Sequence, residues 1–231
     1  MNTTLDVPAA LSKSAHMFDQ VHDHLWELII KGDIKPGDRL KDTEWAGKLG
    51  LSRTPVREAM RKLQQEGVLL PLSAGGYQVK SVSNKDLEEL YTCRAALEKL
   101  ATMEASRRID KQQCQALMQT VELADKAILK KQFDTAFRLN SDFHKAVFEI
   151  ADNSHLAFLL ESISKLVLFY RSALLNRVKS TPELAEAYIA RLTAKQEAHR
   201  AIVRAMASGE HDEAGELMHA HVLASIKELA T

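Results

Sequence analysis

The stretch from Thr43 to Gly67, TEWAGKLGLSRTPVREAMRKLQQEG, constrains the fold of this chain more than any other. It predicts two helices joined by a tight turn, because Gly50 supplies a permissive backbone between two segments whose apolar residues have helical spacing. Thr43 can cap the first helix, and either Ser52 or Thr54 can cap the second. The second helix should then have one buried face and one exposed face.

The two faces of this second helix differ sharply in chemistry. Its apolar residues recur at helical spacing and predict a buried face made of Val56, Met60 and Leu63. Its arginines recur every four residues and predict one exposed basic face made of Arg53, Arg57 and Arg61. A guanidinium group at the start of such a helix can bond a guanine in the major groove, and hydroxyl groups there suit phosphates. On the arginine spacing alone, a solvated basic face is a commoner explanation than a DNA-binding face. The flanking segments must therefore decide between these two explanations.

A short hairpin follows the basic helix. Residues 68–70 and 77–79 predict two strands around a turn with the sequence SAGG at 73–76. A two-stranded wing behind a helix-turn-helix would bring this turn against a neighbouring groove of DNA, so this context favours DNA binding. A helix expected at residues 14–31 would pack across the back of the unit.

Two segments carry a family resemblance. IKPGDRL at 34–40 and LSRTPVREA at 51–59 resemble the signature of GntR-family winged-helix transcription regulators, and the resemblance covers about residues 14–82. It implies that Arg53, Thr54 and Arg57 contact operator DNA, with Gly75 and Gly76 in the wing. The geometry of the helix adds Ser52 and Arg61 to this set.

The composition fits a protein of two domains. A chain of 231 residues with 45% apolar content is long enough for two modest cores. The formal net charge is zero, so the basic face is a local feature, which argues for a directed contact and against general coating of polyanions. No apolar run reaches the roughly 18 residues that span a membrane, so we expect a cytoplasmic protein. Its expected parts are a flexible arm at 1–13, a winged helix-turn-helix domain at 14–82 and an all-helical domain at 83–231.

Beyond residue 83 the pattern is helical throughout. Breaks at polar, glycine or proline residues separate six predicted helices at 84–108, 111–131, 133–151, 154–178, 182–208 and 210–229. Segments of this length with apolar stripes and short connections predict an antiparallel bundle. The fold class is therefore mostly α, with an N-terminal winged helix-turn-helix and a C-terminal all-α bundle.

Four polar residues of the bundle have the spacing of a metal site. Asn140 and His144 are four residues apart and share a helix face. Gly209 divides the last two helices, and His199 and His221 lie about 15 and 18 Å from it at about 1.5 Å per residue, so they sit at similar heights. Three neutral imidazoles and an amide oxygen can hold one divalent ion. The spacing alone leaves metal binding and ordinary histidine packing equally open.

The bundle also resembles a known sensor domain. RAALE at 94–98, FH at 143–144, EAH at 197–199 and MHAH at 218–221 are similar to motifs of the FCD ligand-sensing domain of the FadR subfamily, in its VanR-like form with six helices. The resemblance implies a divalent ion, zinc first and nickel as the alternative, with the ligands Asn140, His144, His199 and His221. Many relatives have aspartate at the first position, so Asn140 predicts weaker retention of the ion.

A metal ion with an open coordination position can take the carboxylate of a small metabolite, and an arginine can clamp that carboxylate from the other side. The resemblance makes Arg94 the first candidate for this arginine, followed by Arg138 and Arg171. The structural alternative for Arg94 is an ion pair with Glu98, four residues on in the same helix.

These features predict a transcription regulator, with repression as the expected effect. We expect it to bind double-stranded operator DNA as a homodimer and to respond to a carboxylate metabolite, with no enzymatic activity and no membrane partner. A metal-dependent enzyme is one alternative, but we find no general base or nucleophile motif. An architectural DNA-binding protein with a structural bundle is the other, and it would give the histidines no role.

Overall fold

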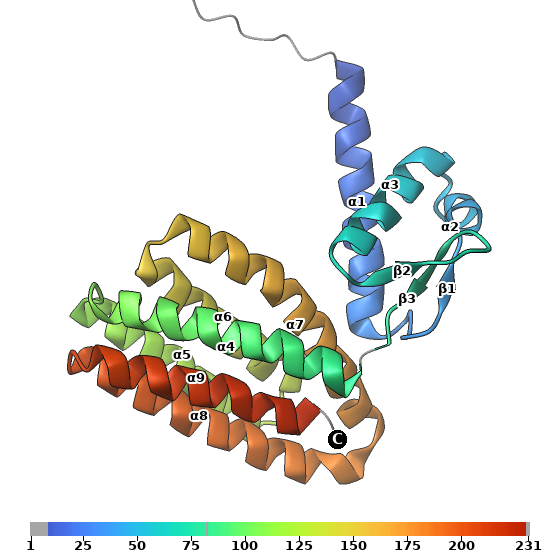
Figure 1. Ribbon diagram of the computed structural model, residues 1–231. Helices are drawn as coiled ribbons and strands as arrows, with labels where there is room; N and C mark the ends of the chain where they lie inside the picture. The colour runs from blue at the N-terminus through green and yellow to red at the C-terminus, as the bar shows by residue number, and fades with distance from the viewer. Residues whose placement is uncertain (1–8, 82, 230–231) are drawn as a thin grey trace, which may run out of the picture. The chain divides into compact units, whose positions relative to one another are not determined.

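The computed structural model describes residues 9–81 and 83–229. Contacts within the chain divide it into two units, residues 1–82 and 83–231 (Figure 1). In the described residues the first unit has these elements: α1 (Ala9–Lys31), β1 (Arg39–Leu40), α2 (Asp42–Leu49), α3 (Arg53–Gln65), β2 (Leu69–Pro71) and β3 (Tyr77–Val79). The strands form one antiparallel sheet with the order β1-β3-β2.

The turn between α2 and α3 has the predicted form. Gly50 is left-handed, with φ of 66°, and its N–H bonds back to the last turn of α2. The helix α2 begins at Asp42, one residue before the expected cap, so Thr43 lies inside the helix and does not cap it. The acids Asp42 and Glu44 in its first turn explain the earlier start, because negative charge stabilises a helix N-terminus. Ser52 occupies the N-cap position of α3, although in the described chain its side chain makes no capping hydrogen bond.

Two further boundaries differ from the sequence prediction. Residues 9–13, expected in a flexible arm, belong to α1, because Ala9 and the residues after it favour helix and nothing interrupts them; residues 1–8 lie outside the described residues. The strand expected at 68–70 is β2 at Leu69–Pro71. The strand β1 was not predicted, because two residues are too few for a periodic pattern.

The second unit consists of helices in its described residues. They are α4 (Asn84–Ser106), α5 (Lys111–Leu129), α6 (Phe133–Ala151), α7 (Ser154–Ser180), the short 3-10 helix η1 (Pro182–Leu184), α8 (Ala185–Ala207) and α9 (His211–Leu229). The six predicted segments are thus confirmed as helices, and the mostly α fold class is confirmed with them.

Local sequence explains where these helices begin and end. Capping boxes start α4, from Ser83 to Asp86, and α5, from Asp110 to Gln113. At the other end, Asp152 is left-handed at the C-cap of α6. These caps set where the helices begin and end.

The packing of the helices surrounds the predicted metal ligands. The helix α4 lies along α9, as Figure 1 shows, and it also packs against α6. The helix α8 packs against α9 and α5. Phe143 of α6 and Ile202 and Met206 of α8 are buried where these helices meet. The centre of the bundle is therefore enclosed by α4, α6, α8 and α9.

Candidate functional sites

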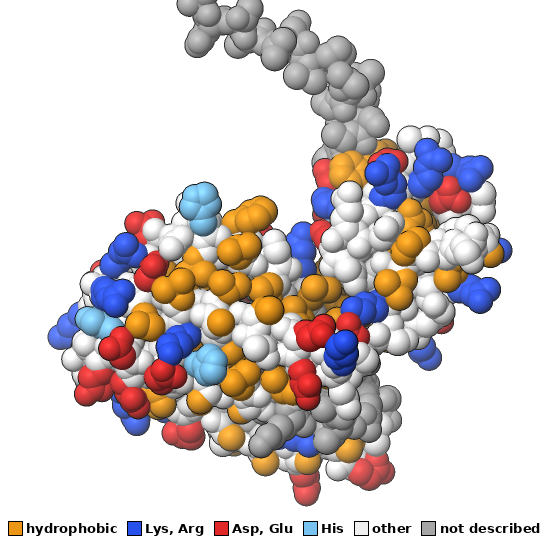
Figure 2. All heavy atoms as spheres, in the orientation of Figure 1, with side chains coloured by type: hydrophobic (Ala, Val, Ile, Leu, Met, Phe, Trp, Pro, Cys, Tyr) orange, Lys and Arg blue, Asp and Glu red, His pale blue; other side chains and the backbone are white. Residues whose placement is uncertain are grey.

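The helix α3 separates its apolar and basic residues as predicted. Val56, Met60 and Leu63 are completely buried, together with Ala59. Arg53, Arg57 and Arg61 are all exposed, and the hydroxyl-bearing Ser52 and Thr54 are exposed at the start of the helix. In the space-filling view, basic side chains gather over the region of α2 and α3 (Figure 2). The structure therefore brings the five predicted α3 residues to the surface.

The ion pairs of these arginines are exposed and weak. Arg53 pairs with Asp42 at 3.1 Å and Arg61 with Glu58 at 3.6 Å. Exposed pairs contribute about 0–1 kcal/mol, so a phosphate can replace either carboxylate at little cost. Arg57 forms no ion pair with another described residue. Of the three arginines of this face, only Arg57 has a guanidinium group that no carboxylate of the described residues holds.

The two wing glycines occupy different environments. Both have positive φ, 87° at Gly75 and 82° at Gly76. A Cβ atom on Gly76 would lie 2.7 Å from the carbonyl oxygen of Leu40 in β1, whereas one on Gly75 would meet nothing within 4 Å. Gly76 is therefore required by the packing of the sheet, and Gly75 leaves the exposed tip open to a close approach of DNA.

Three of the four predicted metal ligands converge in the bundle. His144 lies on α6, His199 on α8 and His221 on α9, and each offers a ring nitrogen within 4.8 Å of the others. The Nε2 atoms of His199 and His221 are 3.1 Å apart. Asn140 is buried one helical turn before His144, on the same face of α6. All four side chains are thus withdrawn from solvent into the same part of the bundle.

The Nδ1 hydrogen bonds of His144 and His199 leave the Nε2 lone pairs of these two rings available for a metal ion. The Nδ1 atom of His144 lies 2.6 Å from Oε2 of Glu98, and because a carboxylate only accepts, Nδ1 carries the proton. The Nδ1 atom of His199 donates in the same way to Oε1 of Gln196 at 3.3 Å. Partners of this kind hold metal-binding histidines in the required tautomer. The donor set therefore fits a divalent ion such as zinc or nickel.

The charge states suit metal binding as well. Burial lowers the pKa of all three histidines, and for His199 and His221 the fall is well below the ordinary value, so the rings are neutral. Burial alone would raise the pKa of Glu98, but the adjacent charge of Arg94 and the bond from His144 outweigh it and lower the pKa to about 2. Neutral imidazoles beside an ionised carboxylate are the forms that a metal ion requires.

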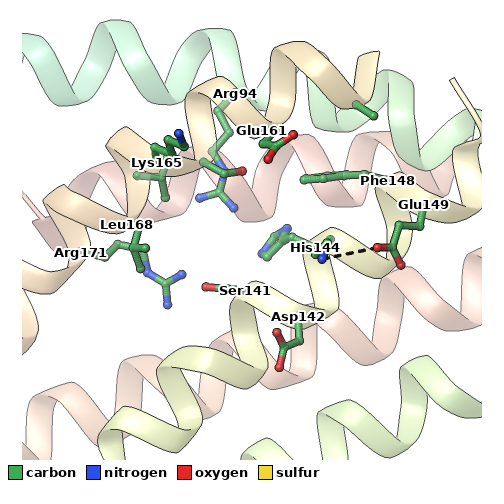
Figure 3. Close-up of a pocket in the computed structure, with 14 residues that line it drawn as sticks. Arg94, Ser141, Asp142, His144, Phe148, Glu149, Glu161, Lys165, Leu168 and Arg171 are labelled. Carbon is green, nitrogen blue, oxygen red and sulfur yellow. Dashed lines mark ion pairs between the residues drawn. The ribbon is translucent and has the colours of Figure 1, made fainter. Parts of the chain in front are cut away.

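A cavity of about 560 Å³ adjoins His144. Arg94 of α4, Ser141 and His144 of α6, and Arg171 of α7 line it. Figure 3 shows the guanidinium groups of Arg94 and Arg171 and the ring of His144 directed into the same space. A cavity of this size is typical of small-molecule sites, and two guanidinium groups in it suit an anion.

Each of the two units matches a known protein family. Residues 18–79 match the model of the gntR family of bacterial regulatory proteins, and residues 89–224, more than half of the chain, match the model of the FCD domain. This chain belongs to the GntR family of bacterial transcription regulators.

Sequence relatives of this GntR regulator align with most of the chain, and a solved structure shares its fold. The HTH-type transcriptional regulator YdhC of Bacillus subtilis is 35% identical over 162 residues, which is 70% of this chain and 72% of YdhC. The probable D-xylose utilization operon transcriptional repressor of Paenarthrobacter nicotinovorans is 28% identical over 89% of this chain and 85% of its own. The solved structure of E. coli McbR/YncC has a TM-score of 0.70 at 22% identity and covers 92% of this chain and 96% of its own.

The family determines the class of activity. GntR proteins are transcription regulators that bind operator DNA, and the FCD domain binds effectors and, in some regulators, metal ions. The GntR regulator described here is therefore not an enzyme. None of its described helices carries an apolar stretch long enough to cross a membrane.

The sites of the GntR regulator differ from the sequence prediction in three residues. Arg138, a predicted effector contact, is exposed and lies outside the lining of the cavity, because it falls on the outer face of α6. Glu98 and Gln196 were not predicted as partners of the histidines. The sequence held a partial signal for each, because Glu98 lies four residues after Arg94 and Gln196 lies three residues before His199 on the same helix. The ion pair between Arg94 and Glu98 does form, and Arg94 lines the cavity as well.

Proposed function

We propose that this regulator represses transcription by binding an operator as a homodimer, and that a carboxylate metabolite bound at a metal site in the bundle releases it. The observation that carries the proposal is the convergence of three buried imidazoles, with ligand atoms within 4.8 Å of one another, beside a cavity lined by Arg94 and Arg171. An architectural DNA-binding protein would give this buried polar centre no role.

The DNA contacts come from α3 and the wing. Arg53, Arg57 and Arg61 reach base edges or phosphates in the major groove, and each specific arginine–guanine pair contributes about 1–3 kcal/mol of discrimination. Ser52 and Thr54 bind phosphates at the helix N-terminus, and the tip at Gly75 approaches the adjacent groove. A regulator of this kind acts on bacterial DNA, so we place it in the cytoplasm.

The homodimer follows from the geometry of DNA reading. One recognition helix reads half a site, and a two-fold pair of chains matches an inverted repeat. Three large apolar side chains are exposed on the helices α4 and α7: Leu100 on α4, and Phe158 and Leu159 on α7. Figure 2 shows apolar side chains gathered across the face of the bundle. We assign this face to contact with a second copy, because an exposed apolar patch of this kind is typical of interfaces.

The effector site combines a metal ion with two arginines. A divalent ion held by Asn140, His144, His199 and His221, zinc in the first place, would take a carboxylate as a fifth ligand. Arg94 and Arg171 then bind the carboxylate oxygens or a second acidic group. Binding that favours one arrangement of the dimer over another changes operator affinity, with a coupling of about 1–3 kcal/mol.

A selection experiment tests this function directly. Purified protein selects its operator from a pool of random duplexes, and fluorescence anisotropy then measures affinity for the selected DNA with and without zinc and a panel of small carboxylates. We expect at least one carboxylate to weaken binding in the wild type and in Arg138→Ala, and to have less effect on Arg171→Ala. Selection of no sequence, or a response to carboxylates that Arg171→Ala retains in full, would contradict the proposal.

A further inference from the structure

Glu98 is a single carboxylate with a different partner on each of its oxygens. Its Oε1 atom accepts a hydrogen bond from Nε of Arg94, and its Oε2 atom accepts one from Nδ1 of His144 at 2.6 Å. Its side chain is only 1% exposed, so water does not compete with either partner. One carboxylate thereby joins an arginine that lines the cavity to a histidine of the metal site.

The bond to His144 fixes the chemistry of that ring. With the proton of the neutral ring held on Nδ1, the lone pair lies on Nε2, and the centre of the ring is 5.4 Å from the centres of the His199 and His221 rings. If the proton moved to Nε2, the histidine could no longer act as a ligand through that atom. Glu98 therefore determines which nitrogen of His144 is available to a metal ion.

The bond to Arg94 fixes the orientation of the guanidinium group. Because Glu98 holds Nε, the two terminal nitrogens stay clear of this carboxylate. Tyr91 lies beside the guanidinium group, and Arg94 lines the cavity beside Arg171 (Figure 3). A carboxylate that binds those terminal nitrogens acts on the same guanidinium group that Glu98 holds. Any shift of Arg94 toward such a ligand changes how strongly Glu98 binds His144.

We propose that Glu98 is a positioning residue that couples the two halves of the effector site, by orienting both the arginine and the metal-binding histidine. This inference rests on the proposed function for the identity of the two halves. Its orienting role, however, can be measured without a metal ion and without an effector.

The first test examines His144 in the metal-free wild-type protein. Nitrogen-15 NMR of the imidazole side chains distinguishes the two neutral tautomers, and loss of one signal set in His144→Gln assigns them. We expect His144 to carry its proton on Nδ1. A proton on Nε2, or a rapidly exchanging mixture of tautomers, would overturn the proposal, and this measurement needs no substitution of Glu98.

The second test measures zinc affinity by competition with a chelating indicator. Glu98→Gln keeps the volume of the side chain and removes its charge, and we expect zinc affinity to fall by about 10–100-fold, as for other orienting partners of metal ligands. The matched control is Glu88→Gln, the same change at an exposed position of α4, which should bind zinc as the wild type does. Equal affinity of the Glu98→Gln protein and the wild type would overturn the proposal.

A double-mutant cycle tests the link to Arg94. Arg94→Lys keeps the positive charge but loses the planar group, so its effect on zinc affinity reports orientation. We expect a clear effect in the wild-type background and a much smaller one in the Glu98→Gln background. Effects of equal size in both backgrounds would show that Arg94 does not act through Glu98.

These outcomes separate the inference from the proposed function. If the wild type binds neither zinc nor nickel but His144 carries its proton on Nδ1, the metal site fails and the orienting role of Glu98 stands. If the wild type binds zinc and Glu98→Gln binds it equally well, the metal site stands and the inference fails.

Discussion

His199 and His221 face each other through their Nε2 atoms, which lie 3.1 Å apart although 22 residues separate them in the chain. Two nitrogen ligands of a tetrahedral zinc ion at about 2.0–2.1 Å lie about 3.3 Å apart, so the pair has nearly the spacing that a metal ion requires. The Nδ1 atom of His199 donates to Gln196, which leaves the lone pair of His199 directed at His221. In the metal-free protein the same distance is that of a hydrogen bond, in which Nε2–H of His221 donates to this lone pair, and a bound ion would replace that proton.

Zinc should therefore stabilise the protein through these rings. A ligand at about 100 times its Kd adds about 2.7 kcal/mol to the free energy of unfolding, so zinc should raise the melting temperature of the wild type. His221→Ala should abolish this rise. His219→Ala, two residues away on the same helix and only half-buried, should keep it. Thermal melts followed by circular dichroism, with and without zinc, give the result, and an equal loss in both variants would remove His221 from the site.

Removal of one guanidinium group should separate DNA binding from metal binding. We expect Arg57→Ala to weaken operator binding by about 1–3 kcal/mol, because this exposed arginine forms no ion pair with another described residue and is one of the proposed base contacts. Arg107→Ala, an exposed arginine at the end of α4, serves as control and should leave operator affinity unchanged. Fluorescence anisotropy measures affinity, and elemental analysis measures zinc. Loss of zinc from Arg57→Ala would contradict the division of the two sites.

Alanine substitutions at the two wing glycines should separate the cost of backbone strain from the cost of a steric clash. Gly75→Ala should cost about 1 kcal/mol, because alanine is strained at positive φ but meets nothing. Gly76→Ala has the same strain and adds a contact of 2.7 Å with the Leu40 carbonyl oxygen, so it should cost at least about 2 kcal/mol. Urea unfolding followed by tryptophan fluorescence can detect the difference, since both tryptophans, Trp26 and Trp45, lie in the first unit. Equal losses would show that the wing relaxes around Gly76.

Most of the fold could be predicted because its signals are local. Each helix of the bundle has its own apolar stripe and its own stop signal, such as the left-handed Asp152 and Gly209, so the six segments were found one by one. The strand β1 could not be found in this way. Its two residues become a strand only by pairing with Gln78 and Tyr77, about 40 positions later in the chain.

In the candidate site, too, local features could be predicted from the sequence and contacts between helices could not. His144, His199 and His221 could be selected from helical spacing, because a residue's face and height on a helix follow from its position. The role of Glu98 could not, since its contact with His144 joins α4 to α6 and depends on how the two helices pack. The exposure of Arg138 depends on the same packing. Helical spacing shows which residues share a face of α6, but it does not show which face borders the cavity.

The stability of the first unit should fall at alkaline pH through His22. This histidine of α1 is 5% exposed, and its Nε2 atom lies 2.8 Å from Oε2 of Glu66, at the end of α3. Burial alone would lower the pKa of His22, but hydrogen bonds to Glu66 and Asp23 outweigh it, so the pKa is raised. The protonated form is therefore favoured by folding, and its contribution is fully present below the unfolded pKa of about 6.5. That contribution is lost as the pH rises through the higher pKa of the folded state.

Substitution of His22 tests the direction of this effect. We expect His22→Gln to lower the free energy of unfolding by about 1.5–3 kcal/mol at about pH 6, where a charged hydrogen bond is lost, and by less at about pH 8.5. His24→Gln, two residues on and exposed, should stay within about 0.5 kcal/mol of the wild type at both pH values. Tryptophan fluorescence again reports the first unit during urea unfolding. A loss for His22→Gln that grows as the pH rises would mean that His22 acts in its neutral form, and the ion pair with Glu66 would not be what joins α1 to the end of α3.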